Sequence, residues 1–378
     1  MSGRPLRVGL DVSSAFARNS GISFYVENLL AGLAEVDKES EFFLYTAFWN
    51  EPARLKELRL PQQSNFHVTY HRVPQRLLLP ADELGFGIQE GWCRELGLDV
   101  FHGLGHIAPP MRRIPVVVTV HHVGGVSPQA TAWEKFYLGP LTNRSVRRAG
   151  RVVAVSEYSR GEAIRHWGLD PAKVVAVHEG GPAPAFQPKP RAAGGAPYVL
   201  HVGSFLEHKN IPVLLRAFHR WTSADGGRPE KLVLVGRPGR DSARVAGLIS
   251  ELKLDGRVDI RPPCAQKELV ALYQGASVVA VPSKIEGFGF PVLEGMACGV
   301  PVVASTAAAL PEVAGDAALL ADPDDEAAWA DALRRVSTDA ALARELREKG
   351  LKRAAHFSWA QAARGTLAVY RDLLEERA

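Results

Sequence analysis

The sequence predicts an α/β protein built from two doubly wound domains, each with a parallel sheet covered by helices on both faces. Three observations predict this fold class. Short apolar, β-branched runs alternate with helical stretches, a segment rich in proline and glycine interrupts the series, and the alternation then starts again. Continuous apolar strands alternating with helices are typical of parallel sheets buried on both sides.

The first series of strands is expected at residues 7–12, 116–120, 151–155 and 173–177, with a further strand ending near His102. A helix is predicted to begin after Asn19, because apolar residues at helical spacing share one face. These residues are Ile22, Val26, Leu29, Leu30 and Leu33. Ser156 follows the third of these runs and is expected to cap the next helix.

The second series is expected at residues 198–203, 231–236, 258–260, 277–282 and 301–304. Ser358 and Gln361 have the spacing of a capping box, which predicts a terminal helix. Residues 180–197 hold too many prolines and glycines for a helix or a central strand. We interpret them as a linker between domain 1–186 and domain 187–357, which face each other across a ligand-binding cleft.

The composition is that of a globular protein of 378 residues, with 46% hydrophobic and 23% charged residues. Its 45 basic and 41 acidic residues are interspersed, so no nucleic-acid partner is expected. Cys93, Cys264 and Cys298 lack the spacing of a metal or redox site and are expected as reduced, mostly buried thiols.

The sequence begins without a leader peptide and has no apolar run near the ~18 to 20 residues that span a bilayer. We therefore expect a cytoplasmic protein. The densest basic stretch comprises Arg144, Arg147, Arg148 and Arg151. It supports the hypothesis of weak peripheral contact with the inner face of the membrane, the alternative being a solvated helix face.

The most informative segment runs from Glu286 to Glu294, with the sequence Glu-Gly-Phe-Gly-Phe-Pro-Val-Leu-Glu. A strand is expected to end near Val281, Pro291 suits the first turn of a helix, and Gly299 suits its end. Glu286 then lies on a loop and Glu294 about one turn into the helix. Helix N-terminal amides bind diphosphates well, and carboxylates accept hydrogen bonds from sugar hydroxyls. The alternative is a capped helix with two exposed glutamates.

This segment and the Gly-Met-Ala-Cys-Gly-Val-Pro-Val-Val-Ala that follows resemble the Glu-x7-Glu motif of retaining glycosyltransferases of family 4 (group 1). The resemblance implies a GT-B fold, with two Rossmann-like domains and a terminal helix, residues 358–378, packed on the first. It implies that Glu286 contacts hydroxyls of the donor sugar and Glu294 those of the ribose. The remaining donor-binding residues of this segment would be Gly287, Phe288, Gly289, Phe290 and Leu293.

A second donor-binding loop is implied by the same resemblance at Gly203, Ser204 and Lys209. The family has a Gly-Arg-Leu-x-x-Arg-Lys pattern here, whose cations contact phosphate. Ser204 stands in place of the first arginine and brings no charge, so Lys209 would stabilise the departing diphosphate with the helix amides. Gly236 and Arg237 would lie near the nucleotide base.

In the first domain, Gly21 resembles a glycine that approaches the donor phosphates. His121 resembles a histidine at the end of a strand that contacts the donor sugar near its reacting carbon. His122 stands where the family has aspartate, and His102 and His106 are assigned to the acceptor side. Isolated histidines are often structural, and that alternative stays open. A GxGxxG dinucleotide fingerprint is absent after Val12, which argues against an oxidoreductase.

The predicted function is retaining transfer of a hexosyl unit from an NDP-sugar to a hydroxyl of a sugar, a lipid-linked glycan or a small molecule. The predicted catalytic residues are His121, Glu286 and Lys209. Similarity to polysaccharide mannosyltransferases favours GDP-mannose, and no metal or other cofactor is expected. The alternatives are a nucleotide-sugar epimerase or a phosphorylase of the same architecture, or a non-catalytic nucleotide-sugar-binding subunit.

Overall fold

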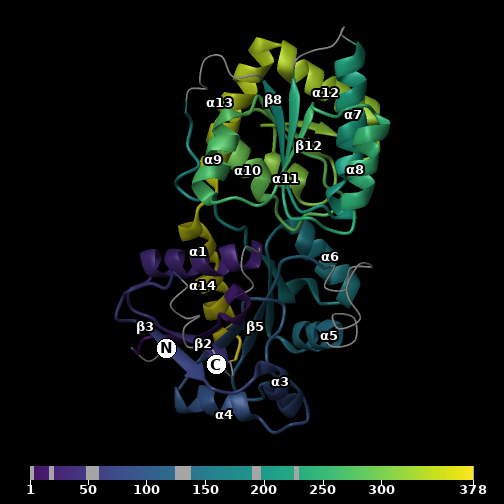
Figure 1. The fold of residues 1–378 in the computed structure, drawn as a ribbon. Coiled ribbons are helices and arrows are strands. Elements are labelled where there is room, and N and C mark those ends of the chain that lie inside the picture. The colour runs from purple at the N-terminus through teal and green to yellow at the C-terminus, as the bar shows by residue number, and fades with distance from the viewer. Residues whose placement is uncertain are drawn as a thin grey trace. The chain divides into compact units, whose positions relative to one another are not determined.

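The structure is a computed structural model that describes residues 4–16, 21–47, 59–123, 138–189, 197–224 and 230–377 (Figure 1). The chain forms two compact units, each described by itself below. Unit 1 comprises Met1–Gly180 and Ser358–Ala378, and unit 2 comprises Gly181–Phe357. Residues 181–189 of the predicted linker have neither helix nor strand, and Phe186 packs edge-on against Tyr273 of unit 2. Residues 190–196 lie outside the described residues.

Unit 1 contains a parallel sheet of seven strands in the order β3-β2-β1-β4-β5-β6-β7. The strands are β1 (Arg7–Asp11), β2 (Glu41–Ala47), β3 (Phe66–His71), β4 (Val100–Gly103), β5 (Val116–Val120), β6 (Arg151–Ala154) and β7 (Val174–Ala176). The predicted strands of the first series are confirmed. Strands β2 and β3 were not predicted, because β2 has aromatic residues in place of a β-branched run and β3 is a half-buried edge strand with polar residues.

Helices cover both faces of this sheet, as predicted. They are α1 (Gly21–Val36), α3 (Gln75–Glu83), α4 (Ile88–Glu95), α5 (Gly139–Arg148), α6 (Glu157–Trp167) and α14 (Trp359–Glu375), with short 3-10 helices η1 (Ser13–Phe16) and η3 (Pro171–Lys173). Apolar residues of α3 to α6 form one core with Phe101 and Val118 of the sheet. The predicted cap of α6 is confirmed, since the Ser156 hydroxyl accepts a hydrogen bond from the Ser159 amide.

Helices α1 and α14 lie side by side on the other face of unit 1 (Figure 1). A Cβ atom at Gly32 of α1 would lie 2.3 Å from the Trp359 carbonyl oxygen, so only glycine allows this approach. The predicted terminal helix is confirmed, and the Ser358 hydroxyl caps it by accepting from the Gln361 amide. This helix joins the N-terminal sheet although it follows the whole of unit 2 in the chain.

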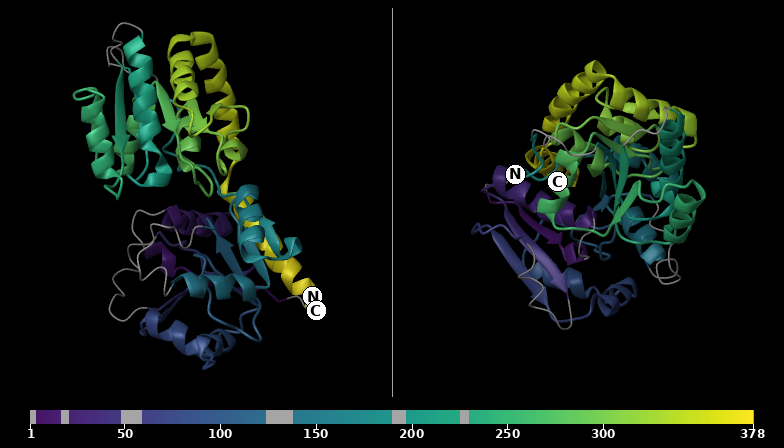
Figure 2. Two further views of the ribbon diagram at one scale, coloured as in Figure 1. Left: turned by 90° about the vertical axis from the view of Figure 1, so that its right-hand side faces the viewer. Right: turned by 45° about the horizontal axis from the view of Figure 1, so that its top comes forward.

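Unit 2 contains a parallel sheet of six strands in the order β10-β9-β8-β11-β12-β13. Helices lie on both sides of this sheet (Figure 2). The strands are β8 (Tyr198–Val202), β9 (Lys231–Val235), β10 (Val258–Arg261), β11 (Val278–Val281), β12 (Val302–Ser305) and β13 (Leu319–Ala321). The second series of predicted strands is confirmed, and the three-residue edge strand β13 is an addition to it.

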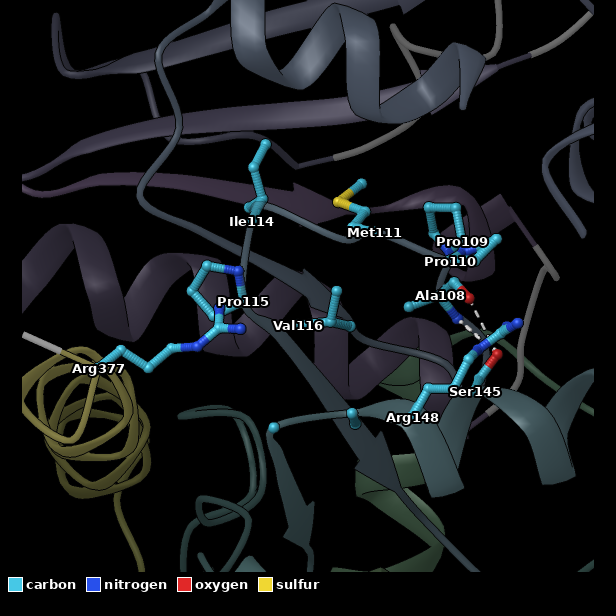
Figure 3. Close-up of a pocket in the computed structure, with 12 residues that line it drawn as sticks. Ala108, Pro109, Pro110, Met111, Ile114, Pro115, Val116, Ser145, Arg148 and Arg377 are labelled. Atoms are coloured by element: carbon cyan, nitrogen blue, oxygen red, sulfur yellow. Dashed lines mark hydrogen bonds between the residues drawn. The ribbon is translucent and has the colours of Figure 1, made fainter. Parts of the chain in front are cut away.

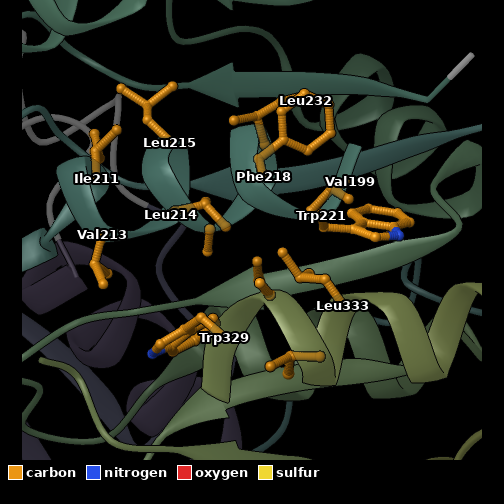
Figure 4. Close-up of a cluster of buried hydrophobic side chains, with 14 of the residues drawn as sticks. Val199, Ile211, Val213, Leu214, Leu215, Phe218, Trp221, Leu232, Trp329 and Leu333 are labelled. Carbon is orange, nitrogen blue, oxygen red and sulfur yellow. The ribbon is translucent and has the colours of Figure 1, made fainter. Parts of the chain in front are cut away.

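The helices of unit 2 are α7 (Ile211–Ala224), α8 (Ser242–Glu251), α9 (Gln266–Gly275), α10 (Phe290–Ala297), α11 (Leu310–Ala314), α12 (Glu326–Thr338) and α13 (Ala340–His356), with the 3-10 helix η4 (Glu207–Lys209). Side chains of α7 and α12 meet Val199 and Leu232 of the sheet in one buried cluster that includes Trp221 and Trp329 (Figure 4). Helix α10 packs on the opposite face, where a Cβ atom at Gly295 would contact Val279.

Each sheet reverses its strand order once. Strand β1 pairs with both β2 and β4, and strand β8 pairs with both β9 and β11. Ligands of doubly wound sheets bind at the carboxyl ends of the strands that flank such a reversal. Within the described residues, no helix is both long and apolar enough to cross a bilayer.

Candidate functional site

The predicted donor-binding residues of unit 2 follow the carboxyl ends of three neighbouring strands. Gly203, Ser204 and Lys209 follow β8, Gly236 and Arg237 follow β9, and the segment from Glu286 onward follows β11. Strands β8 and β11 flank the reversal of strand order, so the sheet brings these segments to one edge.

A partly buried ion pair joins two of these segments. The Lys209 ammonium donates to Oε1 of Glu286 at 2.6 Å, and the two side chains are only 18% and 13% exposed. Burial alone would raise the pKa of Glu286, but the charge and hydrogen bond of Lys209 outweigh that effect and hold the pKa below its ordinary value. The site therefore holds an ionised carboxylate and places a cation beside it.

Glycine permits close contact between the loops that follow β8 and β9. A Cβ atom at Gly236 would lie 1.9 Å from the carbonyl oxygen of Gly203. Backbone hydrogen bonds from Phe205 to Arg237 and from Asp241 to Phe205 tie the same loops together. Any side chain at position 236 would push the loop that carries Lys209 away from its place.

The Glu286–Glu294 segment has the predicted loop-to-helix form. Helix α10 begins at Phe290 with Pro291 in its first turn, and Gly289 precedes it with a φ of 120°, which favours glycine. The Phe288 and Leu293 side chains are buried. A ligand would therefore meet this segment through backbone amides at the start of α10 rather than through those two side chains.

Glu294 lies on α10 and accepts a hydrogen bond from the Tyr273 hydroxyl at 2.6 Å. Burial raises the pKa of Glu294 to about 7, although the Tyr273 hydrogen bond acts in the opposite direction. Neither glutamate of the motif is exposed, so the interpretation as a capped helix with two exposed glutamates is wrong.

Replacing Glu294 by glutamine is expected to stabilise unit 2 at pH 8 by about 3 kcal/mol, because each unit of pKa shift corresponds to about 1.4 kcal/mol. The folded unit binds the Glu294 proton more tightly than the unfolded chain does. The contribution of Glu294 to the stability of unsubstituted unit 2 should therefore fall as the pH rises from about 4.5 through 7, and the variant lacks this contribution. Denaturant unfolding at pH 5 and pH 8 measures this difference.

The matched control is Glu326→Gln, at an exposed glutamate of the same unit that pairs with Arg216. It should leave the pH dependence of unfolding unchanged. If unsubstituted protein and Glu294→Gln gave parallel stability curves between pH 5 and pH 8, the raised pKa of Glu294 would be contradicted.

In unit 1, His121 follows β5 and is buried with both ring nitrogens engaged. Nδ1 lies 3.2 Å from Oε1 of Glu179, and Nε2 lies 3.0 Å from the carbonyl oxygen of Leu104 and must donate to it. The Tyr25 ring packs edge-on against the imidazole with centroids 4.6 Å apart. Burial raises the pKa of Glu179, and the His121 hydrogen bond acts against that rise.

Of the other predicted histidines, two lie beside His121. The His106 Nε2 atom accepts from the His121 amide at 3.1 Å, and the exposed His122 ring lies 5.1 Å from that of His106. His102 is separate from these two: it is fully buried, and its nitrogens bond the Tyr370 and Thr119 hydroxyls. Burial lowers the pKa of His102 to about 3, and the side chain supports the contact between β4 and α14. Gly21 is exposed at the first residue of α1.

Two buried residues at these strand ends were not predicted. Glu179 follows β7 and bonds His121, and His201 lies on β8 near Lys209. Both carry a signal in the sequence, since each is a polar residue inside or directly after an apolar run. That signal alone does not tell a ligand contact from a structural hydrogen bond.

The described cavities lie at the other edge of each sheet. A cavity of about 100 Å³ in unit 1 adjoins Val116 at the start of β5 and is bordered by Arg148 and Arg377 (Figure 3). A cavity of about 580 Å³ in unit 2 adjoins Pro197 and Pro301, which precede β8 and β12. Neither cavity includes a predicted site residue.

The basic stretch proposed for membrane contact divides between α5 and β6. Arg144 and Arg148 both pair with Glu83, and Arg151 pairs with Glu376. These pairs reduce the positive charge that a membrane surface would meet. Peripheral membrane contact stays a prediction.

Comparison with known sequences finds two family matches that together cover most of the chain. Residues 183–353 match the family described as Glycosyl transferases group 1, and residues 19–180 match Glycosyltransferase Family 4. A D-inositol 3-phosphate glycosyltransferase of Catenulispora acidiphila is 30% identical over 292 residues, which cover 72% of this chain and 70% of that protein. Its counterpart in Streptomyces bingchenggensis is 28% identical over 94% of this chain and 85% of its own.

Solved structures share the fold. Sucrose-phosphate synthase from Thermosynechococcus elongatus superposes with a TM-score of 0.75 at 22% identity, covering 99% of this chain and 100% of its own. HepE from Anabaena, solved in complex with UDP and glucose, has a TM-score of 0.72 at 18% identity, covering 98% and 100%. At these identities the likeness concerns the fold alone.

Proposed function

The chain belongs to the group 1, family 4 glycosyltransferases of GT-B fold, and from this premise we propose that it transfers a hexosyl unit from an NDP-sugar to an acceptor hydroxyl with retention of configuration. The observation that carries the proposal is the partly buried Lys209–Glu286 pair at the strand reversal of unit 2. It sets a cation and a hydroxyl-binding carboxylate side by side, next to a helix N-terminus.

Lys209 is proposed to stabilise the diphosphate as it departs. Charge that develops on a leaving group is stabilised most by groups already in place in a water-poor site. Ser204 and the amides at the start of α10 would supply hydrogen bonds to the same phosphates. No metal or cofactor is part of the proposal, because Lys209 and these amides supply the positive potential.

Glu286 is proposed to accept hydrogen bonds from hydroxyls of the transferred sugar, and Glu294 from the ribose. The low pKa of Glu286 keeps it ionised at neutral pH, as an acceptor requires. His121 is proposed to contact the sugar near its reacting carbon, held in place by Glu179 and Tyr25. Retention would follow if the acceptor attacks the face that the leaving group vacates and the departing phosphate takes the acceptor proton.

Donor and acceptor are proposed only as classes. HepE has been solved with UDP-glucose, which supports a UDP-sugar. GDP-mannose, which the sequence resemblance predicts, is the other donor to test. The inositol phosphate in the names of the relatives supports a small polyol phosphate as one acceptor to try first. We propose that the reaction takes place in the cytoplasm.

A thermal-shift screen of UDP-, GDP- and dTDP-sugars tests the donor. Ligand at about 100 times its dissociation constant stabilises the folded state by about 2.7 kcal/mol, so one nucleotide should raise the melting temperature above the others. The donor found is then incubated with acceptors, with and without chelator, and the product is read by NMR at its anomeric proton. Transfer with retained configuration, unchanged by chelator, is the expected result.

Incubation of the donor without an acceptor separates the alternatives. Interconversion of the donor sugar would indicate an epimerase instead. Donor binding without transfer or hydrolysis would indicate a non-catalytic binding subunit. Absence of a shift with every nucleotide sugar would contradict the proposal.

A further inference from the structure

His201 is a buried histidine beside the Lys209–Glu286 pair that the function proposed above does not use. It lies on β8, two residues before Gly203, and is 1% exposed. Nδ1 lies 3.0 Å from the carbonyl oxygen of Ala280, at the end of the neighbouring strand β11. Since a carbonyl only accepts, Nδ1 must carry the ring proton.

The other ring nitrogen has no hydrogen-bond partner within the described part of the chain. Burial lowers the pKa of His201 to about 4, so the ring is neutral at neutral pH and Nε2 is a hydrogen-bond acceptor. Buried polar atoms in proteins almost always have partners, and a water or a ligand can supply one where the protein does not.

The free nitrogen borders the space in front of Gly203. A Cβ atom at Gly203 would lie 3.1 Å from His201 Nε2 and 3.5 Å from Cδ of Lys209. Because residue 203 is glycine, no side chain of that residue fills this position, and Gly203 itself is partly exposed. Lys209 and Glu286 are also the charged groups that influence the pKa of His201, which places the imidazole next to the ion pair.

As a hydrogen-bond acceptor, Nε2 of His201 can bind only a group that donates a hydrogen. Ionised phosphate oxygens only accept hydrogen bonds, so they cannot pair with a neutral Nε2. A hydroxyl can donate to it. A donor has hydroxyls on its sugar and on its ribose. The sugar hydroxyls are assigned to Glu286, which is the neighbour of His201. The ribose hydroxyls are assigned to Glu294, which is bonded to Tyr273.

We propose that His201 Nε2 accepts a hydrogen bond from a hydroxyl of the transferred sugar and so reads the sugar together with Glu286. The inference rests on the proposed function and deepens it. Glu286 and His201 are both acceptors at neutral pH, so the pair favours a sugar that presents donating hydroxyls on the side facing Gly203. A deoxy sugar at that position would leave Nε2 buried and unpaired.

Two substitutions of similar size separate this role from a structural one. His201→Asn can keep the hydrogen bond to Ala280, because its amide nitrogen can take the place of Nδ1, but it removes the acceptor at Nε2. His201→Gln can carry its amide oxygen to the position of Nε2. Affinities are measured by calorimetry for UDP-glucose against UDP and for GDP-mannose against GDP.

In the unsubstituted chain the cognate nucleotide sugar should bind more tightly than its nucleoside diphosphate. The His201→Asn variant should bind the nucleotide sugar about 3- to 10-fold more weakly, which is the range for one hydrogen bond. Its affinity for the diphosphate should be unchanged. Glutamine should restore most of the loss. An equal loss of affinity for the nucleotide sugar and for the diphosphate, or no loss of affinity in the asparagine variant, would overturn the inference. Either result would leave the proposed function in place.

Failure of both nucleotide sugars to bind the unsubstituted chain would instead overturn the proposed function, and this inference with it. Histidine-labelled unsubstituted protein gives a second measurement that needs no variant to fold. The ¹⁵N resonance of His201 Nε2 should move when the nucleotide sugar is added and stay in place with the diphosphate alone. A resonance that is unmoved by the bound sugar would also overturn the inference.

Discussion

Replacing Lys209 by alanine is expected to lower the turnover number by at least about 100-fold, in the range found when one group that stabilises transition-state charge is removed. The Lys209 ammonium pairs with Glu286 in the proposed donor site, and Ser204 offers a hydrogen bond but no charge. Because the effect concerns the departure of the diphosphate, it should persist at saturating donor. Initial rates of product formation at saturating donor and acceptor measure it.

The control for Lys209→Ala is Lys284→Ala in the same unit. Lys284 is exposed and pairs with Asp324 at the surface, so its removal should leave the rate within about twofold, as expected for exposed ion pairs. Near-native turnover of Lys209→Ala, with a rate like that of Lys284→Ala, would remove Lys209 from the site.

Replacing Glu286 by alanine is expected to have an effect of similar size, again at least about 100-fold on turnover. The variant loses the carboxylate proposed to hold sugar hydroxyls, so the sugar is no longer positioned for reaction. Glu286→Gln keeps the shape and one acceptor and should retain more activity than Glu286→Ala. The turnover number and the affinity for the nucleotide sugar are measured for both variants.

The matched control is Glu326→Ala, which removes an exposed glutamate that pairs with Arg216. It should leave both quantities unchanged. Unimpaired transfer by Glu286→Ala would contradict the proposed hydrogen bonds between Glu286 and the sugar hydroxyls. The residues that bind the sugar would then have to be sought at another strand end.

Lys209 and Glu286 are hydrogen-bonded to each other, which affects how the results for their variants are interpreted. Removal of either partner leaves the other charge buried and unpaired, which destabilises the protein. In Lys209→Ala the burial effect on Glu286 loses the charge and hydrogen bond that oppose it most, and the pKa of that carboxyl should rise. Thermal unfolding of each variant is therefore recorded first, and rates are compared below the lowest transition.

The double variant is informative for the same reason. If Lys209 and Glu286 act on one donor and hold each other in place, their combined loss of rate should be smaller than the product of the single losses. If the rate loss of the double variant equals the product of the two single losses, Lys209 and Glu286 act independently of each other.

The sequence by itself determined the fold class and the loop-to-helix form of the segment proposed as the donor site. Apolar runs at regular intervals specify buried parallel strands, and the glycines and Pro291 around Glu286 specify a loop that leads into a helix. These are local signals, because strand burial, turn conformation and helix starts depend on residues that are near in sequence. Strands β2 and β3 lack the β-branched pattern and were missed for the same reason.

Only the tertiary structure decided which polar side chains meet. The partners Lys209 and Glu286 are 77 residues apart in the chain, and His121 and Glu179 are 58 apart. His102, with the same local setting as His121, is bonded on both nitrogens and buried against α14, which follows the whole of unit 2. The order of parallel strands brings distant loops to one edge, so the environment, pKa and hydrogen bonds of each site residue follow from contacts that its own segment does not specify.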